Sequence, residues 1–478
     1  MKKLLVFSFL WCCAYALAEA PSTVAIRNAK IVTVSGPVIA KGTVILKNGL
    51  IEAVGENVAV PADAWVVDGE GMTVYPGLID SLSTVGIPGA APAAGAGGGG
   101  GRGGRGAAAQ TQAAAPGGAQ AAPAERSWGP EDRPQTTSWL LAADELQAGD
   151  KRVETVRGSG ITTAVTFPTR GIFAGQGSII DLVSGEKAAE MVLVPSAGQY
   201  IALGGGGRGG GGGGGFHSSL MGILSYVRQL YLDANHYKAI KDAYAKDPRG
   251  MQRPEYDRAL EGLLASQRFL LPANQLIEID RMLRFGAELK TISPVDQKMI
   301  LYGARESYRP EAVALLKKAN VPVLLSLRWP TPPARAAAAD GDDSNDTLRT
   351  LIERDKAPSA PAALQKAGVK FALYSDGTDA PRDFQREVKK AIDAGLSRED
   401  ALRALTLSPA EIYGISDRVG SIDKGKIANI IVTKGEIFDN ATQVVMVFVD
   451  GKKYTPEAPA AGGRGGPATE DPGAGGNR

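Results

Sequence analysis

Hydrophobic residues recur at strand-like spacing near both ends of the chain. Four β-branched segments stand out: 24–34 and 44–55 near the N-terminus, and 426–435 and 444–454 near the C-terminus. Asn48-Gly49 and Asp450-Gly451 favour the two-residue turn of a β-hairpin, because both positions of that turn need a positive φ. We therefore expect residues 23–75 and 419–455 to form one small β-sandwich domain.

Between these ends, short apolar runs alternate with patterns of helical spacing. Residues 161–167, 321–327 and 369–376 are typical of buried strands, whereas the apolar residues of 218–246 recur every three or four positions. Ser397 is well placed to cap the first turn of a later helix. Strands that alternate with helices indicate a parallel α/β fold.

Three segments interrupt this pattern and a fourth follows it. They are 89–124, rich in Gly and Ala; 204–215, nearly all Gly; 331–346, rich in Ala, Pro and Asp; and the Gly-rich tail 456–478. Such sequences bury little apolar area on ordering, so we expect flexible loops and a disordered tail. Their Arg-Gly-Gly triplets lack interleaved aromatic residues and the formal net charge is only +2, so no nucleic-acid partner is expected.

The first 18 residues have the composition of a secretory signal peptide. Lys2 and Lys3 precede an apolar run that is short for a membrane span, and Ala16-Leu17-Ala18 offers a cleavage site of small residues. Cleavage would also remove Cys12 and Cys13, the only cysteines, and leave no thiol for a disulfide or a metal site. We expect a periplasmic or secreted protein without membrane contact after cleavage; a retained membrane anchor is the alternative.

The C-terminal third carries the most specific motifs. It reads SDGTDAPRDFQREVKKAIDAGLSREDALRALTLSPAEIYGISDRVGSIDKGKIANIIV, and residues 74–86 add a Pro-Gly-apolar-Ile-Asp run. Together with residues 158–180, these segments resemble the amidohydrolase superfamily, in its imidazolonepropionase-like group. The resemblance implies a (β/α)8 TIM barrel over residues 76–418, beside the β-sandwich of the two chain ends.

In that family, one or two divalent ions at the carboxyl ends of the barrel strands activate a water molecule. The ligands are typically a His-x-His pair on the first strand, a lysine or glutamate on the fourth, histidines on the fifth and sixth, and an aspartate on the eighth. When this ligand pattern is aligned with the chain, the His-x-His pair corresponds to Leu82 and Thr84. The fifth-strand histidine corresponds to Pro272, and the sixth-strand histidine to Gly303. Asp376 alone retains its ligand type, and the fourth-strand position stays unassigned.

The number of histidines supports the conclusion that the metal ligands are missing, because the whole chain has only two, His217 and His236. No other alignment can rebuild a site of four imidazoles, and a Ser-His-Asp arrangement would need one of the same two residues. Asp376 is therefore the one candidate catalytic residue. Its alternative is a purely structural role, since an aspartate at a strand end often caps the following turn.

The sequence thus predicts a secreted amidohydrolase homologue with a degenerate metal site and no bound cofactor, either non-catalytic or weakly active. Its expected partners are a small-molecule ligand, a second copy of itself or an active amidohydrolase. The alternative is an active hydrolase of non-peptide C–N bonds, such as cyclic amides, with one divalent metal ion held by carboxylates such as Asp80, Asp376 and Asp379. The substrate or ligand and the oligomeric state are left open.

Overall fold

The computed structural model describes residues 23–88, 133–185, 187–203, 219–331, 347–378, 381–439 and 442–456. The expected signal peptide at 1–18 and the inserts at 89–124 and 204–215 lie outside these ranges. So do the insert at 331–346 apart from Thr331, and the tail apart from Pro456. His217 and Asp379 also lie outside the described residues.

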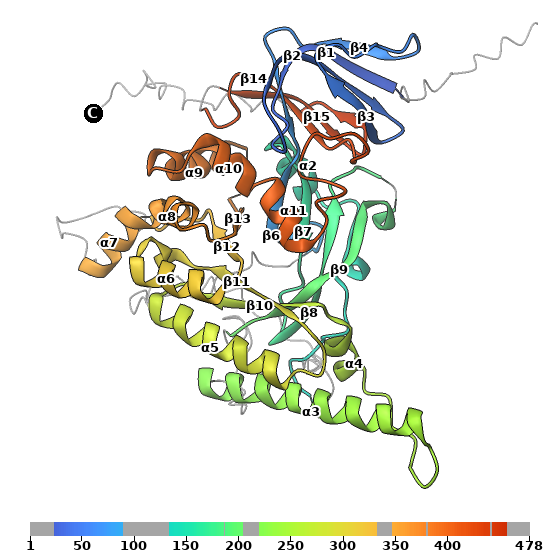
Figure 1. Ribbon diagram of the computed structural model, residues 1–478, viewed down its shortest axis with the longest axis vertical. Coiled ribbons are helices and arrows are strands. Elements are labelled where there is room, and N and C mark those ends of the chain that lie inside the picture. Colours follow the sequence, from blue (N-terminus) through green and yellow to red (C-terminus); the bar gives the residue numbers. More distant parts are fainter. Residues whose placement is uncertain are drawn as a thin grey trace, which may run out of the picture.

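Both ends of the chain contribute to one β-sheet, at the top of Figure 1. Its strands are β1 (Thr23–Ile31), β2 (Ile39–Lys47), β3 (Leu50–Gly55), β4 (Trp65–Asp68), β5 (Thr73–Pro76), β14 (Ile430–Lys434), β15 (Gln443–Val449) and β16 (Lys452–Tyr454). The two ends join where β5 pairs antiparallel with β14. The two expected hairpin turns are present: Asn48, Gly49, Asp450 and Gly451 all have positive φ.

The second sheet is a nearly closed barrel of eight strands. In spatial order these are β6 (Leu78–Ser83), β7 (Ile161–Thr166), β8 (Phe173–Asp181), β9 (Val192–Ile201), β10 (Arg268–Ala273), β11 (Lys298–Gly303), β12 (Val323–Ser326) and β13 (Phe371–Tyr374). The last strand returns to the first, where the Ser81 hydroxyl donates a hydrogen bond to the Leu373 carbonyl at 2.8 Å. The expected α/β barrel fold is confirmed.

One strand departs from the expected pattern of parallel strands. β8 runs antiparallel to both β7 and β9, although Gly171 to Ser178 reads from the sequence as a loop. The connection from Thr166 to Phe173 is too short for the crossover that two parallel strands require. The chain therefore turns back as a hairpin at this point.

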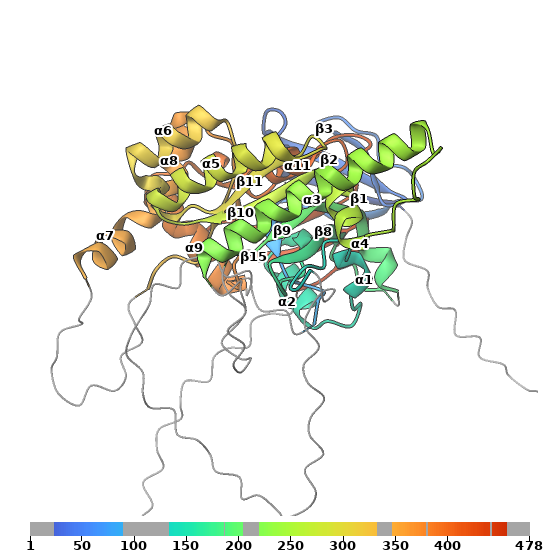
Figure 2. The same ribbon diagram turned by 90° about the horizontal axis from the view of Figure 1, so that it is seen from below.

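Helices surround the barrel and separate it from solvent. They are α1 (Ala142–Glu145), α2 (Arg152–Gly158), α3 (Leu220–Lys246), α4 (Arg258–Ala265), α5 (Leu276–Ile292), α6 (Pro310–Ala319), α7 (Leu348–Lys356), α8 (Ala360–Ala367), α9 (Pro381–Asp393), α10 (Arg398–Ala404) and α11 (Leu407–Tyr413). Short 3-10 helices are η1 (Ala188–Met191), η2 (Arg305–Tyr308) and η3 (Ala357–Ser359). Figures 1 and 2 show α5, α6 and α8 along one side of the barrel, with the long α3 beside α5.

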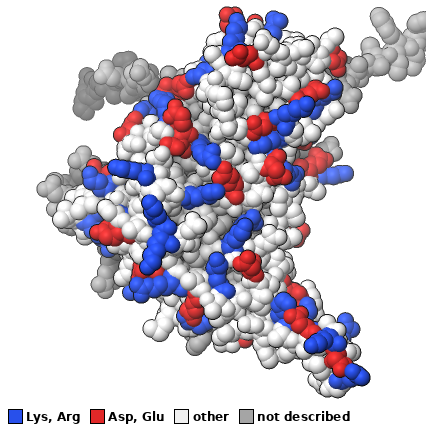
Figure 3. Space-filling model, viewed as in Figure 1, with Lys and Arg blue, Asp and Glu red and all other residues white. Residues whose placement is uncertain are grey.

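The long helix confirms the helical spacing of its segment, because α3 buries its apolar stripe from Ile223 to Ala234. The Ser397 side chain accepts a hydrogen bond from the Asp400 backbone N–H, as expected for a helix cap. Over the face drawn in Figure 3, acidic and basic side chains are interspersed. Among the described residues, no helix combines the length and hydrophobicity needed to span a membrane.

Candidate functional site

The carboxyl ends of the barrel strands other than the antiparallel β8 form one mouth, and the structure brings the predicted site residues there. Leu82 lies on β6 with Thr84 just beyond it, Pro272 lies on β10, Gly303 ends β11, and Asp376 follows β13. In the order of the sheet, β10, β11 and β13 are the fifth, sixth and eighth strands. The resemblance assigned Pro272, Gly303 and Asp376 to strands with these same numbers, so the order of the sheet agrees with that alignment.

The backbone at Gly303 has no room for a metal-binding side chain. Its φ is +100°, and a Cβ added there would lie 2.4 Å from Oδ1 of Asn274. A histidine at this position would therefore strain the backbone and displace its neighbour. At the other three positions, the buried side chains of Leu82, Thr84 and Pro272 offer at most one hydroxyl oxygen.

Aromatic side chains fill the interior beside these positions. The rings of Tyr200 on β9 and Tyr302 on β11 are stacked, with centroids 5.3 Å apart and planes inclined by 28°. Phe167 packs on Tyr200 with centroids 5.8 Å apart, and Tyr374 belongs to the same buried cluster. The Tyr302 hydroxyl donates a hydrogen bond to the Tyr200 hydroxyl at 3.0 Å.

One aromatic residue of this cluster lies on the fourth strand of the sheet, for which the sequence predicts no ligand position. β9 is the fourth strand of the sheet, and Tyr200 is the residue near its carboxyl end that joins the interior cluster. The sequence carried a signal for this cluster: Tyr200, Tyr302 and Tyr374 each stand close to the end of a strand-like run. Nothing in the sequence showed that the three rings converge.

Asp376 follows the last barrel strand with a left-handed backbone, φ 51°. Its Oδ2 accepts a hydrogen bond from the Ser326 hydroxyl on β12 at 2.7 Å, whereas its Oδ1 has no hydrogen-bond partner among the described residues. Burial raises the pKa of Asp376, and this rise is opposed by the Ser326 hydrogen bond and by the positive charges of Arg305 and Arg328. The side chain thus reaches across to a neighbouring strand.

The phenol groups around this carboxyl group resist ionisation. Burial raises the pKa of Tyr200 to about 12, and burial raises the pKa of Tyr302 and of Tyr374 well above the usual value. A nucleophile or general base at neutral pH needs a pKa shifted toward neutrality, and these shifts go the other way. The phenols therefore stay neutral: Tyr200 and Tyr302 hydrogen-bond to each other, and Tyr374 packs in the same buried cluster.

Asp80 is used to close the barrel. Its Oδ1 accepts a hydrogen bond from the Ser375 backbone N–H at 3.1 Å, and its Oδ2 accepts one from the Ser375 hydroxyl at 2.5 Å. A third, longer hydrogen bond of 3.5 Å comes from the Leu82 backbone N–H. This carboxylate therefore ties the first strand to the segment after the eighth.

The donors at the mouth do not fit the metal centre that the fold family implies. Within the described parts of the chain, no group of three or more His, Cys, Asp and Glu side chains is arranged to hold a metal ion. His236 is exposed on α3, outside the barrel, and lines a separate polar cleft of 670 Å³. The described oxygen donors at the mouth include the carboxylates of Asp80 and Asp376, the hydroxyl groups around them, and the amide oxygen of Asn274 beside Gly303.

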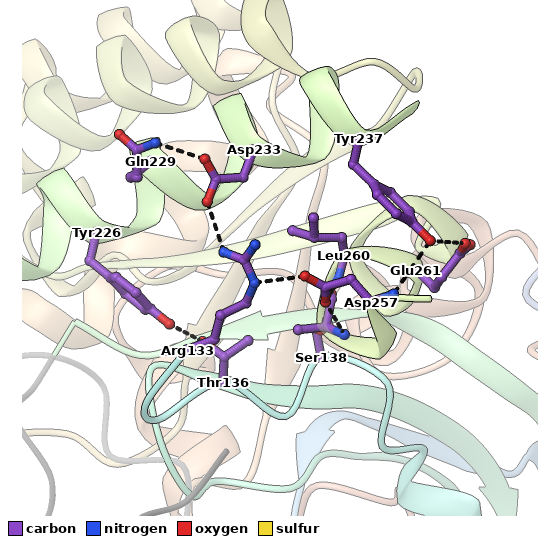
Figure 4. Close-up of polar contacts among 11 residues, drawn as sticks. Arg133, Thr136, Ser138, Tyr226, Gln229, Asp233, Tyr237, Asp257, Leu260 and Glu261 are labelled. Carbon is purple, nitrogen blue, oxygen red and sulfur yellow. Dashed lines mark hydrogen bonds and ion pairs between the residues drawn. The ribbon is translucent and has the colours of Figure 1, made fainter. Parts of the chain in front are cut away.

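The polar cleft beside α3 is built around Arg133, as Figure 4 shows. The Arg133 guanidinium donates hydrogen bonds to Asp233 on α3 at 2.7 Å and to Asp257, the N-cap of α4, at 2.9 Å. Nearby, the hydroxyl groups of Thr136 and Tyr226 lie 2.5 Å apart. These contacts hold α3 and α4 against the segment that precedes α1, which is a structural role.

A small cavity of 160 Å³ lies closer to the barrel mouth. It is bordered by the loops that follow β6 and β7, with Pro88 and Pro168 on its walls. Its polar side chains include Thr137 and Thr169. This volume is below the range of about 300–1,000 Å³ that is usual for small-molecule pockets.

Comparison with known proteins supports the family resemblance. Residues 301–454 match the model of the amidohydrolase family. An N-substituted formamide deformylase from Arthrobacter pascens is 33% identical over 107 residues, which are 19% of this chain and 20% of that protein. The matched segment thus spans about a fifth of the length of that relative.

Solved structures share the fold over most of the chain. An amidohydrolase from Thermotoga maritima is 24% identical, with a TM-score of 0.66 over 91% of this chain and 100% of that chain. A prolidase complexed with N-methylphosphonate-L-proline is 15% identical, with a TM-score of 0.50 and the same coverage. Molinate hydrolase is 14% identical, with a TM-score of 0.50 over 91% of this chain and 95% of that chain. At these identities the likeness establishes the fold.

Proposed function

Since residues 301–454 match the amidohydrolase family and the described fold is that of an amidohydrolase, we propose that this chain is a non-catalytic member of the family. The observation that carries the proposal is the stacked pair Tyr200 and Tyr302, which fills the barrel interior beside the expected ligand positions. The protein then acts through binding. We place it outside the cytoplasm, after removal of residues 1–18.

Both the donor atoms at the mouth and the space beside them disfavour a hydrolytic metal centre. A hydrolytic metal centre needs three or more protein ligands and an open position for the attacking water. Here the first-, fifth- and sixth-strand positions hold Leu82, Pro272 and Gly303, and tyrosine rings pack beside them. Rebuilding such a centre would require several substitutions together with the removal of buried rings.

The rival proposal is an active hydrolase with one carboxylate-held ion, and one observation favours it. Oδ1 of Asp376 is buried without a hydrogen-bond partner among the described residues, and such an atom is costly unless something binds it. Against this proposal, both oxygens of Asp80 already accept hydrogen bonds from Ser375. A bound ion would have to compete with these bonds.

Two measurements on the purified protein separate the proposals. We expect well under one equivalent of zinc, manganese or iron per chain, and no measurable hydrolysis of amide or lactam test substrates. Asp376→Asn is the matched variant, because it keeps the size and one acceptor oxygen but removes the charge. Stoichiometric metal together with turnover that this variant abolishes would establish the carboxylate-held site instead.

A further inference from the structure

The hairpin between β2 and β3 turns at Asn48-Gly49, and Asn48 is the only asparagine of the chain that a glycine follows. Both residues have a left-handed backbone, with φ 50° at Asn48 and 80° at Gly49. Asn48 is exposed, and its carboxamide forms no hydrogen bond within the described parts of the chain. The side chain is therefore free to turn toward its own backbone.

A free asparagine carboxamide is an electrophile for the backbone nitrogen of the next residue. The Gly49 nitrogen bonds to Cγ of Asn48 and loses its proton, while the Cγ–Nδ2 bond breaks and ammonia leaves. The resulting five-membered succinimide is opened by water at either carbonyl group, which gives aspartate or isoaspartate. Glycine favours the first step, because without a Cβ it leaves the attacking nitrogen unhindered and the backbone free to change conformation.

The other described asparagines lack this combination. None of them precedes a glycine; they are Asn28, Asn57, Asn235, Asn274, Asn320 and Asn429. Asn28 shares the positive φ, but its amide donates a hydrogen bond to Asp68 at 3.2 Å. Asn320 matches Asn48 more closely, with φ 50° and an exposed side chain, yet the β-branched Val321 follows it and hinders the attacking nitrogen. Asn320 is therefore the matched comparison within the same molecule.

The Asn48-Gly49 turn packs against the other end of the chain. A Cβ added at Gly49 would lie 2.7 Å from Oδ1 of Asp450, and one added at Gly451 would lie 2.9 Å from the Gly49 Cα. The Gly49 carbonyl accepts a hydrogen bond from the Ala428 backbone N–H at 2.8 Å. The turns of the N-terminal and C-terminal hairpins are thus in contact, in the sheet that both chain ends form at the top of Figure 1.

We propose that Asn48 is a site of spontaneous covalent modification, where conversion to isoaspartate loosens the contact between the two ends of the chain. Isoaspartate carries the backbone through its side chain and adds one methylene group before Gly49. The Gly49 carbonyl is then displaced from the Ala428 N–H, and the tight turn against Asp450 and Gly451 is lengthened. The inference goes beyond the proposed function and holds whether or not the barrel mouth is catalytic.

Peptide mapping of the purified full chain, incubated at neutral pH and physiological temperature, tests the site. Mass spectrometry with fragmentation that distinguishes aspartate from isoaspartate follows each asparagine over time. We expect Asn48 to lose its amide about tenfold faster than Asn320 or more, a ratio that needs only about 1.4 kcal/mol in the activation barrier. Asn48→Gln should stop the change at this position, because the longer side chain would have to close a less favourable six-membered ring. The comparison with Asn320 is made in the wild-type chain, so it does not depend on the folding of any variant.

Hydrogen exchange of the incubated protein tests the consequence. Exchange in the isoaspartate form should quicken in residues 426–428 and 449–452, while the barrel strand β11 stays as in the fresh protein. Freshly purified Asn48→Asp is the matched control, because it carries the new charge without the added methylene group and should exchange as the wild type does. Loss of the amide at Asn48 no faster than at Asn320 overturns the proposal. So does an isoaspartate form whose exchange in residues 426–428 and 449–452 is unchanged.

Discussion

Tyr200 and Tyr302 stack at the mouth of the barrel, with ring centroids 5.3 Å apart and a hydrogen bond of 3.0 Å between their hydroxyl groups. They come from the fourth and sixth strands of the sheet, and both are buried. The pair therefore contributes apolar area and a satisfied polar contact beside Leu82 and Gly303, two of the positions to which the resemblance assigns metal ligands. Removing the contacts between these two side chains should therefore lower the free energy of unfolding.

Shortening Tyr302 should destabilise the fold in two separable steps. Tyr302→Phe removes the hydrogen bond to Tyr200 and should lower the free energy of unfolding by about 1–2 kcal/mol. Tyr302→Ala also leaves a cavity and should cost about 3–5 kcal/mol. Urea unfolding followed by circular dichroism measures both, with the exposed Tyr256→Phe as the control. Equal stability of wild type and Tyr302→Ala would show that the cluster is not packed as described.

Asp376→Asn should change the free energy of unfolding by only about 1 kcal/mol or less. The amide keeps an oxygen that can accept the hydrogen bond from Ser326, and it removes a carboxyl group whose ionisation burial disfavours. Ser326→Ala is the companion variant, because it removes the donor and leaves Asp376 in place. Chemical denaturation at neutral pH compares the two. A loss of several kcal/mol in Asp376→Asn would mean that the charge itself holds the mouth together.

The carboxyl group of Asp181 should make stability fall as pH rises. It is buried where the barrel meets the terminal sheet, accepting hydrogen bonds from Thr163 and Asn429, and burial raises its pKa from 3.8 to about 6. The folded state thus holds a proton that the unfolded chain releases between about pH 4 and 6, so the stabilisation is full below that window and lost above it. This change in the pKa of Asp181 corresponds to a contribution of about 3 kcal/mol at most to the free energy of unfolding.

Asp181→Asn mimics the protonated acid and should remove this dependence. Relative to wild type, the variant should gain stability steadily from pH 4 to pH 7 and then level off. Thermal or urea unfolding at several pH values measures the difference. The exposed Asp63→Asn serves as a control that should track wild type. A constant difference between Asp181→Asn and wild type across this range would contradict the raised pKa.

Glu306→Gln should loosen α7 without unfolding the barrel. The amide oxygen can still accept the hydrogen bond from the Leu276 backbone N–H, but the ion pair with Arg349 loses its charge. Because Arg349 is more than half exposed, the expected cost is modest, about 1 kcal/mol. Hydrogen exchange should quicken in residues 347–356, whereas Asp355→Asn on the same helix should have no effect. Unchanged exchange in Glu306→Gln would show that other contacts hold α7.

The sequence by itself determined the features that depend on near neighbours. Asn48-Gly49 and Asp450-Gly451 turn because their backbones tolerate positive φ, and the apolar stripe of α3 follows from helical spacing. Composition alone also limited the metal chemistry, since two histidines cannot supply four ligands wherever the chain places them.

The tertiary structure decided what closure of the barrel brings together. Tyr200 and Tyr302 are 102 residues apart in the chain, and Ser326 and Asp376 are 50 apart, so no local pattern predicted their contacts. Most of β8 reads as a loop because of its glycines, and its antiparallel pairing depends on the short connection from β7, which no local pattern reports. The spacing of hydrophobic residues shows which face of a strand or helix is buried. The residues that this face contacts are determined only when distant strands and helices pack around one core.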